Sequence, residues 1–109
     1  MFKLVFYVPY DKAEEVKAAV FNTGAGKMGH YDQCCWQVLG QGQFRPLAGS
    51  QPFIGDAPFA GESAVIEAVS EYRIEMVCSD YVINAAVSAL KEAHPYEEPA
   101  YDVWRLAEF

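Results

Sequence analysis

The stretch VIEAVSEYRIEMVCSDYVINAAVSALKEAHP, residues 65–95, decides the fold. Its first half alternates apolar and polar side chains with a period of two, which predicts a half-buried strand over residues 65–78. A helix can also be drawn there, but it would waste this alternation. In the second half Ser79 or Asp80 can cap a helix, and His94-Pro95 ends it because proline disfavours helical geometry in the preceding residue. The apolar face of that helix consists of Val82, Ile83, Ala86, Val87 and Leu90.

The flanking segments complete a regular order of elements. Period-two alternation indicates further strands, apolar residues spaced three and four apart indicate a second helix, and a run rich in glycine and proline indicates a long loop. Loops of this length are often functional. The expected elements are a strand over residues 2–8, a helix from Asp11 to Gly24, a strand over residues 31–39, a loop over residues 40–63 and a closing strand over residues 101–106.

This order is typical of an α+β fold of the ferredoxin-like βαββαβ kind, in which two helices cover one face of a four-stranded antiparallel sheet. At 109 residues the chain is expected to be a single domain, residues 1–109. The other face of the sheet would be uncovered, and its apolar residues favour an oligomer. These residues are Val5, Tyr7, Val65, Val69 and Val77.

Composition and charge exclude several classes of function. The chain has 8 basic and 15 acidic residues, a formal charge of −7, and the basic residues are scattered singly, so we expect no nucleic-acid partner. No apolar stretch approaches the ~20 residues that cross a bilayer, and no signal peptide is recognisable, so we expect no membrane partner and a cytoplasmic location. The odd number of cysteines, with Cys34 and Cys35 adjacent, favours reduced thiols.

A glycine block, GAGKMG at residues 24–29, has the spacing G-x-G-x-x-G. In a dinucleotide-binding fold these glycines precede a helix, whose amino terminus binds the pyrophosphate. Here they follow a helix and precede a strand, so a dinucleotide site is not expected. Two interpretations remain open: a helix end with a tight turn, or a concavity of backbone amides that binds an anion, in which Arg45 could take part across a subunit boundary.

A second polar block, HPYEEP at residues 94–99, places an imidazole, a phenol and two carboxylates close together. It fits a stiff turn between helix and strand, a metal site built on His94 and a carboxylate, or acid–base catalysis with a group from elsewhere. Strand geometry would place Cys34 and Cys35 on opposite faces, with Cys34 in the core. A cysteine nucleophile activated by His30 or His94 would need the fold to bring the groups together.

Four segments together resemble a known domain. They are GAGKMGHYDQC (24–34), GQGQFRPL (40–47), QPFIG (51–55) and HPYEEPAYD (94–102). In this order they resemble the YqfO-type domain, which is inserted in larger proteins of the Nif-three-like dinuclear-metal-centre family and also occurs as short separate proteins. The sequence HPYE followed by proline is also similar to the end of the CutA divalent-ion-tolerance proteins, whose fold resembles that of the PII signalling proteins.

The resemblance implies a CutA/PII-like module that assembles as a trimer, with the long central hairpin contributing to contacts between subunits. It implies no dinuclear metal centre in this chain, because the flanking domains of the larger proteins build that centre. We therefore expect a cytoplasmic homotrimer, not an enzyme, that acts as a sensor or regulator by binding a small ligand or a divalent metal ion at clefts between subunits. A protein partner is a further expectation.

The candidate site residues are those of the matching motifs. For ligand binding they are Gly24, Gly26, Gly29, Tyr31, Gly42, Phe44, Arg45, His94, Tyr96, Glu97 and Glu98. For a metal ion they are His94, Glu97 and Cys34. Two other functions stay open, a CutA-like divalent-metal protein and a small hydrolase-like enzyme that uses His94.

Overall fold

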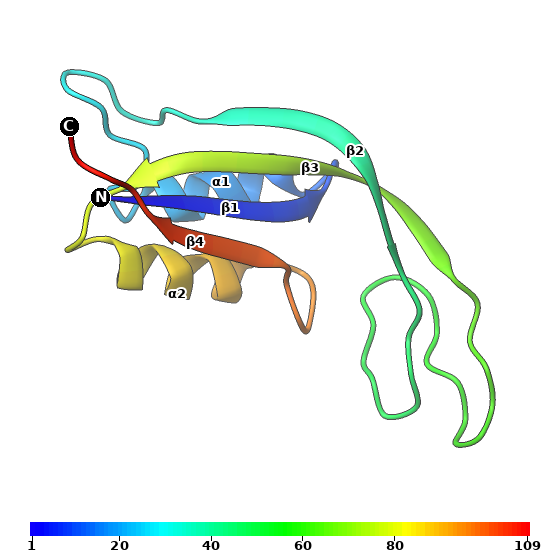
Figure 1. Ribbon diagram of the computed structural model, residues 1–109. Helices are drawn as coiled ribbons and strands as arrows, with labels where there is room; N and C mark the ends of the chain where they lie inside the picture. The colour runs from blue at the N-terminus through cyan, green and yellow to red at the C-terminus, as the bar shows by residue number, and fades with distance from the viewer.

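The computed structural model describes residues 1–109 and contains one four-stranded antiparallel sheet with two helices packed against one face (Figure 1). The strands lie in the order β2-β3-β1-β4. The predicted βαββαβ fold is confirmed. The elements are β1 (Phe2–Pro9), α1 (Ala13–Phe21), β2 (Trp36–Phe44), β3 (Glu67–Cys78), α2 (Ile83–Ala93) and β4 (Tyr101–Arg105).

The core lies between the sheet and the helices. Alternate residues of β1 and β3 point toward the helices, and each helix buries one stripe against them. Burial of each large apolar side chain stabilises the fold by roughly 1.5–3 kcal/mol. The fully enclosed residues are Leu4, Phe6, Val8, Val16, Val20, Ile74, Ala86 and Leu90.

The predicted side-chain cap of α2 is wrong, although both helices are confirmed. Neither helix has a side-chain cap, and the capping positions are Lys12 and Val82. The backbone carbonyl of Ser79 accepts the amides that begin α2, while the Asp80 carboxylate pairs with the terminal amino group and Arg105. Asp80 lies two residues before the capping position, Val82, and its side chain makes no hydrogen bond to the start of the helix. The end of α2 at His94 was predicted correctly.

The second strand begins and ends later than predicted. It runs over Trp36–Phe44. Residues 31–35, expected to begin the strand, therefore lie in a loop, and residues 40–44, expected to begin the long loop, belong to the strand. Glycine disfavours strands, but pairing with β3 outweighs this tendency: Gly40 is opposite Glu71 and Gly42 is opposite Val69. The face expected to be open is also partly covered, because Val5 is fully buried.

Strands β2 and β3 continue beyond the end of β1 and carry their connecting loop away from the body of the molecule (Figure 1). We call residues 41–70 the arm. With its arm the molecule measures 52 × 24 × 23 Å. Neither helix of the structure combines the length and the apolar character needed to cross a bilayer.

Candidate ligand-binding site

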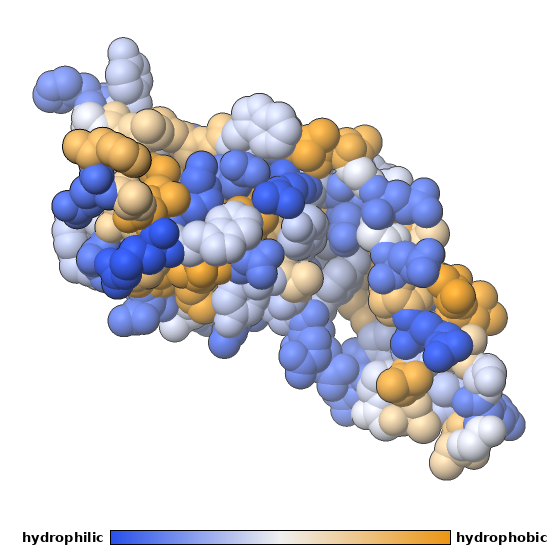
Figure 2. Space-filling model, viewed as in Figure 1, coloured by the Kyte–Doolittle hydropathy of each residue, from blue (hydrophilic) through white to orange (hydrophobic).

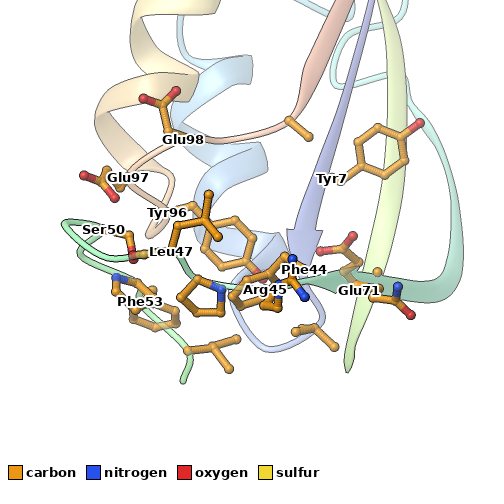
Figure 3. Close-up of a pocket in the computed structure, with 17 residues that line it drawn as sticks. Tyr7, Phe44, Arg45, Leu47, Ser50, Phe53, Glu71, Tyr96, Glu97 and Glu98 are labelled. Carbon is orange, nitrogen blue, oxygen red and sulfur yellow. The ribbon is translucent and has the colours of Figure 1, made fainter. Parts of the chain in front are cut away.

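A cleft of about 410 Å³ lies where the arm joins the body, bounded on the other side by the segment between α2 and β4 (Figure 3). Its walls are largely aromatic and aliphatic, with a few polar groups among them. The apolar lining includes Phe44, Pro46, Leu47, Phe53, Ile54 and Val69. The polar lining includes Tyr7, Arg45, Ser50, Glu71, Tyr96, Glu97 and Glu98. This combination of apolar walls and few polar groups is typical of small-molecule sites.

His94 fixes the turn that forms one wall. Its Nδ1 accepts a hydrogen bond from the backbone amide of Tyr96 at 3.1 Å, so the ring hydrogen is on Nε2, which donates to the Tyr7 carbonyl at 2.6 Å. The residue is only 5% exposed. Burial lowers the pKa of His94 despite the bond to Tyr7, and the ring is neutral at physiological pH.

Tyr96 lies at the centre of the cleft among other rings. Its ring centroid is 6.3 Å from that of Phe44, 6.2 Å from that of Phe53 and 4.8 Å from that of His94. The Tyr96 hydroxyl is buried and has no hydrogen-bond partner. Burial, together with the negative charges of Glu71 and Asp11, raises the pKa of Tyr96 to about 12. The phenol is therefore neutral and can donate or accept one bond from a bound molecule.

Glu71 reaches the cleft from β3 and packs against the backbone of Gly42. A Cβ at position 42 would lie 2.6 Å from the carboxyl carbon of Glu71, so only glycine leaves room for this side chain. Burial raises the pKa of Glu71 above its usual value, and the carboxylate forms no salt bridge. A half-buried carboxylate without a counter-ion is costly for the fold, as expected of a group kept for binding.

The remaining polar groups lie at the rim. The amide of Gln51 donates to Glu97 Oε2 at 3.0 Å, which ties the loop of the arm to the turn after α2. Glu98 and Arg45 are exposed at the cleft edge. The cleft therefore presents three carboxylates and one guanidinium.

Two of the three predicted blocks meet in this cleft, and the third does not within one chain. Gly42, Phe44 and Arg45 come from the second block and the His94–Glu98 turn from the third. In the first block, the amide of Gly26 donates to the Val77 carbonyl at 2.9 Å, close to the start of β1.

His94 instead contacts Tyr7, near the end of β1. Val77 pairs with Lys3, four residues before Tyr7, so the two places are about 14 Å apart, since a strand rises about 3.4 Å per residue. The first block is a series of tight turns: Gly24, Gly26 and Gly29 all have positive φ, of 100°, 80° and 58°. The tight-turn interpretation is thus confirmed. Its Tyr31 is 75% exposed.

The predicted metal ligands are not brought together. Cys34 donates its amide to the carbonyl of Gly26, at the far end of the sheet from Glu97, and both ring nitrogens of His94 are bonded to the backbone. No group of three or more histidine, cysteine, aspartate and glutamate side chains is placed to hold a metal ion. Within one chain these donors do not fit a metal site. The same two hydrogen bonds leave neither ring nitrogen of His94 free to accept a proton in catalysis.

Glu71 was not among the site residues predicted from the sequence. A signal was available, because a glycine inside a strand often marks the close approach of another group. Gly42 is such a glycine, and the group that approaches it is the Glu71 carboxylate. Tyr7 and Phe53 were also missed, because only the folded chain brings them to the cleft.

Comparison with known proteins extends over nearly the whole chain. It is 44% identical over 104 residues to a GTP cyclohydrolase 1 type 2 homolog of Mycobacterium leprae, which covers 95% of this chain and 26% of the relative. The Bacillus subtilis homolog is 44% identical over 102 residues, with coverages of 94% and 26%. The chain thus spans about a quarter of the length of these curated relatives. No model of a known protein family matches it.

Solved structures agree with these relatives. The Bacillus cereus protein related to NIF3 superposes with a TM-score of 0.77 at 36% identity, over 98% of this chain and 26% of that one. The divalent cation tolerance protein CutA from Archaeoglobus fulgidus superposes with a TM-score of 0.65 at 14% identity, over 100% of this chain and 87% of that one, which shows the shared fold alone. The chain is therefore the counterpart of one domain of the Nif-three-like proteins, a YqfO-type domain with the CutA-like fold.

Proposed function

We propose that this chain is a regulatory module that binds a small molecule in the cleft at the base of the arm and catalyses no reaction. The observation that carries the proposal is the Tyr96 hydroxyl, which is buried and has no partner in the protein, on a side chain that lines the cleft. An unpaired buried polar group costs roughly 1–3 kcal/mol. A bound ligand that bonds to the hydroxyl would recover this free energy.

The absence of an activated group favours binding over catalysis. His94 uses both nitrogens to hold the turn, and the phenol of Tyr96 is too weak an acid to ionise near neutral pH. Cys34 and Cys35 belong to the loop at the other end of the sheet. A metal-handling role of the CutA kind has only the likeness of fold in its favour.

The proposed assembly is a cytoplasmic homotrimer held together through the arms. The surface area of 7214 Å² exceeds the about 6,000 Å² usual for a monomer of 12.1 kDa. The radius of gyration of 15.6 Å likewise exceeds the usual value of about 13 Å. Large apolar side chains are exposed along the arm (Figure 2). They are Leu47, Phe53, Phe59, Val65 and Ile66.

A trimer would also give the glycine block a place in the site. Within one chain it lies too far from the cleft, but its exposed residues Lys27, Met28 and Tyr31 are available to the cleft of a neighbouring subunit. The ligand would then lie between subunits and could report on, or stabilise, the assembly.

Native mass spectrometry of protein purified without a metal-affinity tag tests the proposal, because one spectrum reports both the assembly and any retained molecule. We expect a trimer whose mass exceeds three chains by that of a small organic ligand. A bare monomer would contradict both parts of the proposal. A trimer that retains only a metal ion would favour the metal-handling role.

A further inference from the structure

We propose that the molecule bound in the cleft is an organic cation, a primary ammonium group carried on an aromatic or short alkyl body. This inference rests on the proposed function and names the chemical class of its ligand. It follows from the charge, the walls and the unpaired polar groups of the cleft.

The charge of the cleft selects a cation. Three carboxylates, Glu71, Glu97 and Glu98, line it together with the single guanidinium of Arg45. Arg45, Glu97 and Glu98 are exposed at the rim, whereas Glu71 is partly buried beside Gly42 and has no salt bridge. An anionic ligand would be repelled by Glu71, whose charge is partly buried and therefore only weakly screened.

The aromatic walls select an apolar body next to the charge. Phe44 and Phe53 lie on either side of Tyr96 with tilted rings, and Figure 3 shows the three grouped at the centre of the cleft. Aromatic faces attract ammonium groups, and they also bury a flat or short alkyl group. The volume of about 410 Å³ is suitable for a small molecule.

Two unpaired polar groups of the cleft, the Tyr96 hydroxyl and the Glu71 carboxylate, can accept hydrogen bonds from the ligand. An ammonium group has three hydrogens to donate. The Tyr96 hydroxyl has no hydrogen-bond partner, the Glu71 carboxylate has no salt bridge, and both side chains line the same cleft. An amine that donates to both would satisfy the buried hydroxyl and supply the missing counter-ion.

The test is a titration of the isotopically labelled protein followed by ¹H–¹⁵N correlation spectra. The probes are phenethylamine, phenethyl alcohol and phenylpropionate, which share an aromatic body and differ in charge. We expect the amine to shift the amides of residues 42–45, 71 and 96–98, to bind at least about tenfold more tightly than the alcohol, and phenylpropionate to cause no shift there. Glu71→Gln should weaken the amine about tenfold to a hundredfold, the usual effect of one charge-assisted bond.

Glu67→Gln is the matched control, because Glu67 is on the same strand but does not line the cleft, and it should leave the affinity unchanged. If phenylpropionate binds in the cleft as tightly as the amine, the charge class is wrong while the cleft remains a binding site. If the amine shifts no amide in the cleft, or Glu71→Gln has no effect, the inference is overturned. Whether the cleft retains any ligand at all, as the proposed function requires, is tested separately by the native mass spectrum.

Discussion

Replacing His94 by alanine is expected to lower the free energy of unfolding by about 2–4 kcal/mol, because a buried side chain with two hydrogen bonds is lost. The amide of Tyr96 and the carbonyl of Tyr7 would each lose a partner. Urea denaturation followed by circular dichroism measures the change. His30→Ala is the control, since His30 is exposed and should change stability by less than about 0.5 kcal/mol.

The same residue should make stability depend on pH. The folded state lowers the pKa of His94 below its ordinary 6.5, so the unfolded chain takes up the proton more readily. The contribution of His94 to stability is therefore complete above about pH 6.5 and is lost as the pH falls toward the lowered pKa. The difference between wild type and His94→Ala should shrink over that range. A stability difference that stays constant with pH would show that His94 does not stabilise the fold through its neutral form.

Replacing Gly26 by alanine is expected to cost about 2–4 kcal/mol as well. The residue has a φ of +80° and is buried, and a Cβ there would lie 2.8 Å from the Phe21 ring and 2.9 Å from the Cys34 carbonyl oxygen. A left-handed conformation costs a residue with a Cβ roughly 1–2 kcal/mol, and overpacking adds roughly 1–3 kcal/mol. Thermal unfolding monitored by circular dichroism measures the loss.

Gly29→Ala is the control for this substitution. Gly29 also has a positive φ, of +58°, but a Cβ there would have no neighbour within 4 Å, so only the backbone strain remains. We expect a cost of about 1–2 kcal/mol. Equal losses at the two positions would show that close packing at Gly26 is unimportant. Unchanged stability together with lost ligand binding in Gly26→Ala would instead favour direct participation of the glycine block in the site.

The elements with strong periodicity were predictable from sequence. The alternation in β3 and the apolar stripe of α2 each specify which side faces the core, and neither depends on a distant partner. Strand β2 was not predictable in this way, because its glycines become strand only through pairing with β3. The predicted cap of α2 failed because the helix begins later than expected, at Ile83, while Asp80 pairs with the terminal amino group and Arg105.

The candidate site was predictable only in part. The sequence identified two segments that meet at the cleft, residues 42–45 and 94–98, but did not show that the glycine block lies at the other end of the sheet. It left open whether His94 stiffens the turn, binds a metal ion or takes part in catalysis; in the structure the two hydrogen bonds of its ring hold the turn. The roles of Glu71 and Tyr96 depend on burial and on unpaired polar atoms, which only the folded chain determines.

The most direct test of the cleft as a binding site is to compare retained ligand in the native mass spectra of wild type, Gly42→Ala and Gly40→Ala. A methyl group at position 42 would displace the Glu71 carboxylate, which can move at little cost, whereas a methyl group at position 40 meets nothing within 4 Å. The account predicts that all three proteins fold and assemble alike, and that Gly42→Ala alone loses the ligand. Retention by Gly42→Ala at the level of Gly40→Ala, or no retained molecule in the wild type, would contradict it.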